Sequence, residues 1–170
     1  NTILVLAVDP GNNVVFNSAV VTVVDSIKPT ITAPANLTVN ANGSCVATGV
    51  QLGTPVTADN CSIATLTNNA PSSFPLGTTT VTWTVTDVNG NTRTATQTVT
   101  VVDNTNPTIT APANVTVNAN NACAAFNVAL GTPVTADNCS VASVVNNAPT
   151  VFPLGNTTVT WTVTDGAGLS

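Results

Sequence analysis

The sequence predicts an all-β protein built from tandem antiparallel sandwiches, and three observations predict it. The 170 residues include 33 Thr, 28 Val and 23 Asn; Thr and Val favour strands, and Asn favours turns. Several segments alternate apolar and polar residues with a period of two, as half-buried strands do. The chain also matches itself when it is shifted by 78 residues, which predicts repeated copies of one small domain.

The internal match is long and has no gap. Residues 28–92 and 106–170 are identical at 46 of 65 positions. The recurring blocks are Pro29–Asn36 at Pro107–Asn114, Gly53–Ser62 at Gly131–Ser140 and Val81–Asp87 at Val159–Asp165. This near-identity predicts that the copies share one fold and that neither is specialised for a reaction of its own.

The same shift divides the chain into three parts. Residues 1–26 correspond to the C-terminal hairpin of a preceding repeat, 27–104 to a complete repeat, and 105–170 to a repeat lacking its last strand. Incomplete repeats leave strand edges unpaired, so we expect this segment to belong to a longer array. The alternative is that one subunit's N-terminal hairpin supplies the missing strand of the next, which would build a strand-exchanged filament.

The individual elements follow from the pattern in chain order. Residues 1–26 predict a hairpin, and proline and Asn-Gly interruptions predict short strands at 30–32, 37–40, 46–52 and 63–67. Thr80–Thr86 places Val81, Trp83 and Val85 on one face. After the turn residues Asp87–Asn91, Thr92–Val102 returns as the second strand of a hairpin. No segment has the periodicity of a helix.

The composition excludes several functions. Only 5% of the residues are charged, with two Lys or Arg, seven Asp or Glu and no His. General acid-base catalysis draws mostly on those residue types, so we predict that the chain is not an enzyme. A net charge of -5 lacks the basic clusters that neutralise phosphates, so no nucleic-acid partner is expected. No apolar run is long enough to predict a membrane span.

An ordered series of motifs in this chain resembles a known family. Pro29-Thr-Ile-Thr-Ala-Pro-Ala-Asn36 precedes Cys45, and Pro55-Val-Thr-Ala-Asp-Asn-Cys61 precedes Phe74-Pro-Leu-Gly77 and the strand that ends at Asp87. This order, which closes on Val-Thr-Val-Val-Asp103, is similar to that of the hyalin repeat (HYR) family and covers essentially the whole chain. The resemblance implies an immunoglobulin-like β-sandwich that occurs in extracellular proteins, often in tandem, and is associated with adhesion.

A structural function follows from this resemblance and from the short proline-limited linkers Val24–Pro29 and Val102–Pro107. We expect a stalk or filament segment of a large secreted or cell-surface adhesin, whose first partners are the neighbouring repeats. Such Thr- and Asn-rich copies look like those in surface proteins of Bacteroidota-type bacteria, including gliding-motility adhesins, so an extracellular location on a bacterium is expected. The alternative is a module that binds surface glycans or other cell-surface proteins.

The four cysteines form two repeat-equivalent pairs. With 15 residues between partners and no His in the chain, they do not fit a zinc site of the Cys-x-x-Cys kind. Family members commonly carry two more cysteines, where this chain has Ala33 and Ala95. The resemblance then implies that the remaining ones form a second bridge, Cys45–Cys61, repeated as Cys123–Cys139, in an oxidising compartment. Free buried thiols are the alternative.

No organic cofactor is expected, and calcium is the one candidate ion. All seven Asp occupy positions fixed by the repeat, and the simplest interpretation is that each caps a turn. Calcium is the sharper alternative, because Asp87, Asn89 and Asn91 place oxygens at alternate positions of one tight loop. Asp103 begins a junction similar to those of calcium-stiffened cadherin arrays. The equivalent loop at Asp165, however, lacks several of these ligands.

Three further predictions concern other side chains. Trp83 and Trp161 are expected to fill the sandwich core. Asp25-Ser26-Ile27 resembles the Asp-Ser/Thr-aliphatic acceptor of bacterial O-glycosylation systems, so Ser26 is a candidate glycosylation site. The threonine-rich faces of the hairpin at 78–100 are expected to be solvated strand faces, with O-glycan attachment and ice binding as alternatives.

Overall fold

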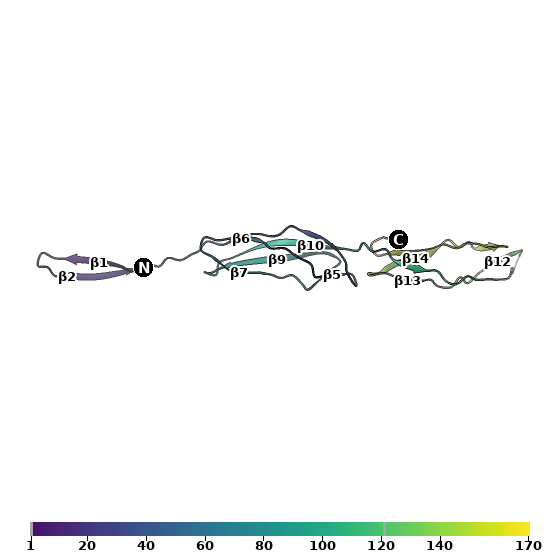
Figure 1. The fold of residues 1–170 in the computed structure, drawn as a ribbon, viewed down its shortest axis with the longest axis horizontal. Coiled ribbons are helices and arrows are strands. Elements are labelled where there is room, and N and C mark those ends of the chain that lie inside the picture. Colours follow the sequence, from purple (N-terminus) through teal and green to yellow (C-terminus); the bar gives the residue numbers. More distant parts are fainter. Residues whose placement is uncertain (1, 121) are drawn as a thin grey trace. The chain divides into compact units, whose positions relative to one another are not determined.

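The computed structural model describes residues 2–120 and 122–170, and all regular elements in those residues are β-strands (Figure 1). The all-β prediction is therefore confirmed. In chain order the strands are β1 (Thr2–Val8), β2 (Val14–Val20), β3 (Thr30–Thr32), β4 (Leu37–Asn40), β5 (Val46–Thr48), β6 (Val56–Ala58), β7 (Ile63–Asn68), β8 (Ser73–Pro75), β9 (Gly77–Asp87), β10 (Thr92–Val102), β11 (Thr108–Thr110), β12 (Ala124–Phe126), β13 (Val134–Ala136), β14 (Val141–Asn146), β15 (Val151–Pro153) and β16 (Trp161–Asp165).

The chain divides into two compact units. One comprises the residues up to Ala33 together with Pro55–Asn68 and Trp83–Ala95; the other comprises Pro34–Thr54, Asn69–Thr82 and Thr96–Ser170. The division crosses strands β9 and β10, so the repeat at 27–104 contributes one of its ends to each unit. We call residues 27–104 the first repeat and residues 105–170 the second repeat.

The N-terminal hairpin forms as predicted. Strands β1 and β2 pair antiparallel from Thr2↔Val20 to Val8↔Val14 around a turn in which the Asp9 carboxylate accepts the amides of Gly11 and Asn13. Both strands are exposed along their whole length. The hairpin thus satisfies its own backbone ladder but leaves its large apolar side chains in water.

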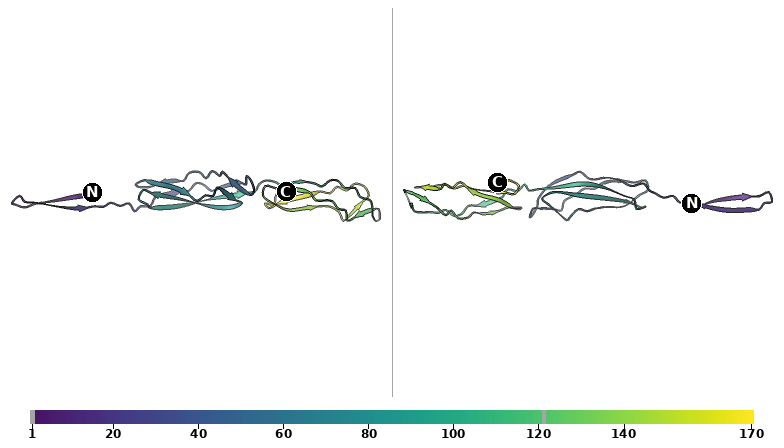
Figure 2. Two further views of the ribbon diagram at one scale, coloured as in Figure 1. Left: turned by 90° about the horizontal axis from the view of Figure 1, so that it is seen from below. Right: turned by 180° about the vertical axis from the view of Figure 1, so that it is seen from behind.

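The first repeat is organised around one long hairpin. Strands β9 and β10 lie at the centre of a four-stranded sheet in the order β4-β10-β9-β7, and they run along the length of the repeat in both views of Figure 2. The short pairs β3–β6 and β5–β8 are antiparallel. One pair departs from the predicted antiparallel pattern: β4 lies parallel to β10, with Val99↔Leu37 to Val102↔Asn40.

The short strands are where sequence and structure differ. The strand expected at 46–52 ends at Thr48, because Gly49 adopts a left-handed φ of 68° that breaks the extended run. Strands β6 and β8 were not predicted, since each has three residues bordered or ended by proline. Tertiary pairing with β3 and β5, rather than a local pattern, makes them strands.

The core lies between the long hairpin and the short pairs. Its buried apolar side chains come from β5, β8, β9 and β10: Ala47, Phe74, Val81, Trp83, Val85, Val99 and Val101. The alternation predicted for Thr80–Thr86 is thus confirmed. Gln97 is also fully buried, and its side-chain amide donates to the carbonyls of Ala35 (2.7 Å) and Leu52 (3.0 Å). Strand β10 therefore contributes apolar side chains to the core. It also contributes the side-chain amide that binds two carbonyls of segments outside the strands.

The second repeat repeats the short pairs but has no counterpart of β10 among the described residues. Pairs β11–β13, β12–β15 and β14–β16 keep the registers of their equivalents. The segment 115–118, which corresponds to β4, forms no strand, because the strand that β4 pairs with is missing. Val115 and Val117 are consequently about half exposed, at 51% and 50%.

An open groove of about 620 Å³ marks the place that β10 fills in the first repeat. It is lined by the 115–117 segment, by Ala125 of β12, by Phe152 of β15 and by Trp161 of β16. Trp161 is half-buried, whereas its equivalent Trp83 is 6% exposed. The two tryptophans therefore share a position in the repeat but differ in how completely they are covered.

Candidate metal centre

Each repeat carries an aspartate at the end of its central strand that organises the following turn. In the first repeat the Asp87 carboxylate accepts the backbone amides of Asn89 (2.8 Å) and Asn91 (2.9 Å), and the Asn91 side chain donates to its second oxygen (2.8 Å). The predicted turn-capping role is therefore present in the structure. Asp87 is nevertheless only 1% exposed, which is unusual for a carboxylate.

Two more aspartates meet Asp87 from other elements. One carboxylate oxygen each of Asp25, Asp59 and Asp87 lies within 4.8 Å of the other two. Asp25 precedes β3 and Asp59 follows β6, so the paired strands β3 and β6 bring both to this end of the repeat. We call these three residues the first aspartate cluster.

The second repeat forms the same arrangement. Asp103, Asp137 and Asp165 also place one oxygen each within 4.8 Å of the others, and we call them the second aspartate cluster. Asp165 is 2% exposed, and one of its oxygens accepts the amides of Ala167 (2.9 Å) and Leu169 (2.8 Å). Its other oxygen, Oδ2, is buried without a hydrogen-bond partner.

The partners of the two clusters differ for a reason that is visible in the sequence. Leu169 stands where the first repeat has Asn91, so no side-chain amide reaches Asp165 Oδ2 as Asn91 reaches Asp87. In the second cluster four buried oxygens lack a partner: Asp103 Oδ2, Asp137 Oδ1, Asn138 Oδ1 and Asp165 Oδ2. In the first cluster only Asp59 Oδ1 does so among the described residues.

Hydrogen bonds keep several of these carboxylates ionised. Backbone donation from Ile27, together with side-chain donors that include Asn60 and Asn89, holds the pKa of Asp25 below its usual value. Burial opposes ionisation of Asp87, but donors from Asn91 and Asn89 outweigh it and lower its pKa. Burial likewise opposes ionisation of Asp103, and donation from Thr105 and Asn138 lowers its pKa in the balance. Asp25, Asp87 and Asp103 are therefore ionised at neutral pH.

The four predicted calcium ligands do not all lie together in the structure. Asp87 and Asp103 belong to two different clusters rather than to one site. Asn89 and Asn91 use their amide nitrogens as donors, to Asp25 Oδ2 (3.1 Å) and to Asp87 Oδ2 (2.8 Å). Asp25, Asp59, Asp137 and Asp165 were not among the predicted ligands. Their common spacing of 78 residues was visible, but their meeting in space depends on the β3–β6 pairing.

The four cysteines, Cys45, Cys61, Cys123 and Cys139, are free thiols in the structure. The Cys45 carbonyl accepts the amide of Leu76 (3.1 Å), and the carbonyl of Ser62, the residue after Cys61, accepts the amide of Val88 (3.1 Å). The pairing of Cys45 with Cys61 and of Cys123 with Cys139 therefore stays a prediction.

Cys45 has an uncommon backbone conformation. Ser44 and Cys45 have φ values of 45° and 61°, and the Val46 amide donates to Gly43 (3.0 Å), as in a tight turn with two left-handed central residues. Ala122 and Cys123 repeat these values at 45° and 58°. Glycine or asparagine is the usual choice in such a turn, so cysteine at this position is held at a conformational cost in both repeats.

Another cysteine lies beside Cys45 within the same compact unit. Cys139 lies near the Cys45 thiol and the Asp103 carboxylate. Burial, followed by these two neighbours, raises the pKa of Cys139 to about 12. Cys61, the repeat equivalent of Cys139, likewise contacts Asp25, and that contact raises its pKa.

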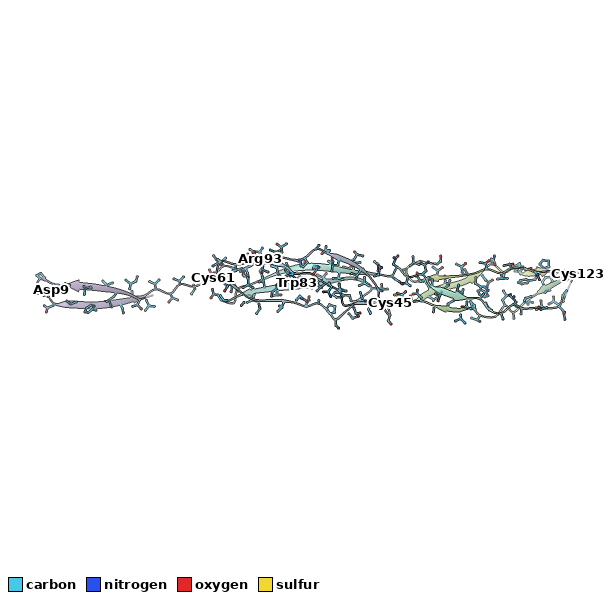
Figure 3. The ribbon with its side chains drawn as sticks, in the orientation of Figure 1. Asp9, Cys45, Cys61, Trp83, Arg93 and Cys123 are labelled. Carbon is cyan, nitrogen blue, oxygen red and sulfur yellow. The ribbon has the colours of Figure 1, made fainter. Side chains whose placement is uncertain are left out.

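The predicted glycosylation site lies at the surface of the first compact unit. Ser26 is exposed, next to the Asp25 carboxylate that accepts the Ile27 amide (3.0 Å), and its glycosylation stays a prediction. Asp9, Cys61 and Trp83 are labelled in Figure 3, which places Asp9 in the turn of the N-terminal hairpin. No helix in the described part of the chain is long and apolar enough to span a bilayer.

The repeated strand registers and the repeated aspartate clusters define a class of protein, the tandem β-sandwich repeats. The family model that matches the chain is the HYR domain, at residues 24–101 and again at 102–170. The chain therefore belongs to the HYR family, as the sequence motifs indicated, and contains two tandem copies of this non-catalytic, extracellular adhesion-type repeat. Searches of curated proteins and of solved structures returned no match.

Proposed function

We propose that this segment is a spacer in a large secreted or cell-surface adhesin, projecting a binding or motility element away from a bacterial cell. The observation that carries the proposal is the repetition of one small sandwich, with the same registers, in an almost uncharged chain. Two basic residues in 170 leave few sites for trypsin-like proteases. A spacer needs length and persistence rather than a specific surface.

A domain exchange separates a spacer from a recognition module. We expect that replacing residues 27–170, in the native protein on its own cells, with unrelated β-sandwiches of equal length preserves adhesion. A recognition module that binds glycans or cell-surface proteins would lose adhesion in the same exchange. Deletion of these residues without replacement is the matched comparison, because it shortens the projection and leaves the binding element intact.

The strand-exchanged filament is a second candidate function, in which a strand from one copy of the chain would pair with the second repeat of another. The groove is lined by apolar side chains that β10 covers in the first repeat, with Val115 and Val117 about half exposed. An added strand would meet the edge of β16 on one side and the 115–118 segment on the other. Addition of a strand to an open sheet edge is a common mode of peptide recognition.

A synthetic peptide tests whether the groove accepts such a strand. The peptide Thr92–Val102 is expected to bind the 170-residue chain and to raise the thermal midpoint of the second repeat. A peptide with Val99 and Val101 changed to Asp is the control, because these two side chains are buried in the first repeat. Equal binding by both peptides, or no binding by the first, would remove the observation that favours a filament.

A further inference from the structure

The second aspartate cluster gathers three carboxylates in a chain that has few basic side chains. Its three carboxylates lie within 4.8 Å of one another, and the chain has only two basic side chains, Lys28 and Arg93. Like charges at this separation repel one another, more strongly where water is excluded. Three carboxylates placed this close are stable together when a cation or several donors accompany them.

The donors present do not meet this need. Asp137 Oδ2 accepts the amides of Cys139 (2.7 Å) and Ser140 (2.8 Å), and Asp103 Oδ1 accepts those of Thr105 and Asn138. One oxygen of each carboxylate thus accepts hydrogen bonds from backbone amides or from a side-chain amide. The second oxygen of each, with Asn138 Oδ1, is buried and unpartnered. Buried polar atoms are rarely left in this state, and an ion is one of the standard explanations.

The burial of Asp165 is the strongest evidence for a bound ion. Its side chain is only 2% exposed, and no donor lies within hydrogen-bond distance of Oδ2. The contacts of its other oxygen with Ala167 and Leu169 fix the orientation of the carboxylate, so the free oxygen is held in place and does not turn to solvent. An oriented, dehydrated carboxylate beside two others is a preorganised ligand.

We propose that the second aspartate cluster binds a calcium ion. Calcium takes six to eight oxygen ligands at about 2.3–2.6 Å and tolerates irregular geometry. Carboxylate oxygens within 4.8 Å of one another can surround such an ion with shifts of a few tenths of an ångström. Magnesium would draw them in to about 2.0–2.1 Å in a near-octahedral arrangement, which the fixed Asp165 carboxylate resists. Waters complete the coordination.

The first aspartate cluster binds calcium more weakly. The side chain of Asn91 already donates to Asp87 Oδ2, and that of Asn89 donates to Asp25 Oδ2. These amide groups already satisfy the two carboxylate oxygens by hydrogen bonds. They must rotate away before those oxygens can coordinate an ion. The substitution of Asn91 by its equivalent Leu169 is therefore what makes the second cluster the better site.

Calorimetric titration of calcium chloride into the chelator-treated 170-residue chain tests the proposal. We expect one dominant site, with a dissociation constant on the order of 0.1–1 mM, as in extracellular calcium modules, and a weaker response to magnesium chloride. Asp137→Asn should weaken this site by more than about tenfold, because it removes a ligand charge and keeps an oxygen for the Cys139 and Ser140 amides. Asp59→Asn, the equivalent change in the first cluster, should leave the dominant site in place.

Each outcome decides the assignment. No binding by the unaltered chain at 10 mM calcium (about ten times the weakest expected constant) would overturn the proposal, as would equal affinity in Asp137→Asn. Loss of the dominant site in Asp59→Asn would move it to the first cluster and would overturn the role given to Leu169. If circular dichroism shows that Asp137→Asn does not fold, Asp103→Asn takes its place, because its Thr105 and Asn138 donors can also reach an amide oxygen.

Discussion

Trp83→Ala is expected to destabilise the first repeat by about 3–5 kcal/mol, the usual cost of truncating a buried large aromatic side chain. Trp83 is 6% exposed and lies between Val81 and Val85, which are fully buried on the same face of β9. The cavity cannot collapse readily, because β9 is paired on both sides in the four-stranded sheet. Urea unfolding followed by circular dichroism measures the loss, and hydrogen exchange assigns it to β9.

Trp161→Ala is the matched control for this prediction. It removes the same side chain at the same position of the second repeat, but Trp161 is half-buried and lines an open groove. Its truncation should cost distinctly less, since the side chain has fewer neighbours to lose. Equal costs at the two positions would mean that β10 contributes little to the burial of Trp83, which would contradict our account of the core.

The long elements of the fold could be predicted because their signal is local. Thr80–Thr86 alternates strictly, and its apolar positions Val81, Trp83 and Val85 are buried. The repeat extended this prediction to the second copy without further evidence. Family membership was predictable for the same reason: an ordered series of turn and strand motifs survives in the sequence whatever the packing does.

The aspartate clusters could be predicted only in part. All seven aspartates were seen at repeat-fixed positions, and the turn at Asp87 was recognised. A sequence shows neighbours along the chain, however, and Asp25 and Asp59 approach Asp87 only because β3 pairs with β6. The three-residue strand β6 left no periodic pattern to reveal that pairing. The calcium ligands were therefore sought in the loop at Asp87 and at the junction that begins with Asp103, and Asp25 and Asp59 were not named among them.

The cysteines show the same limit more sharply. Spacing and family resemblance suggested that the two cysteines of one repeat bond to each other. In the structure all four cysteines are free thiols, and Cys139 lies near Cys45. Sequence separation would not suggest this proximity, because Cys45 and Cys139 lie in different copies of the repeat.

Under oxidising conditions we expect a disulfide between Cys45 and Cys139. Both residues belong to one compact unit, and the Cys45 thiol lies near enough to Cys139 to help raise its pKa. With oxidised glutathione as the oxidant, the two protein thiols lose two electrons and two protons, the S–S bond forms, and two molecules of reduced glutathione leave.

The pKa of Cys139 sets the pH dependence of this reaction. The attacking species in disulfide exchange is the thiolate. Since burial and its neighbours Cys45 and Asp103 raise the pKa of Cys139 to about 12, this residue stays a thiol at neutral pH. Attack by the Cys139 thiolate should therefore accelerate throughout the range from pH 7 to pH 9. A rate that levels off within this range would contradict the assignment of Cys139 as the attacking residue.

Peptide mapping without reduction identifies the bond. The 170-residue chain, oxidised with glutathione and then alkylated, should give a linked peptide pair containing Cys45 and Cys139, with Cys61 and Cys123 alkylated. Cys139→Ser should abolish the link, whereas Cys61→Ser, at the equivalent position of the first repeat, should not. A Cys45–Cys61 pair would sink the prediction. The expected bond would shield the residues between Cys45 and Cys139 from extension under force. Its reduction should therefore release about 300 Å of chain in a single-molecule pulling measurement.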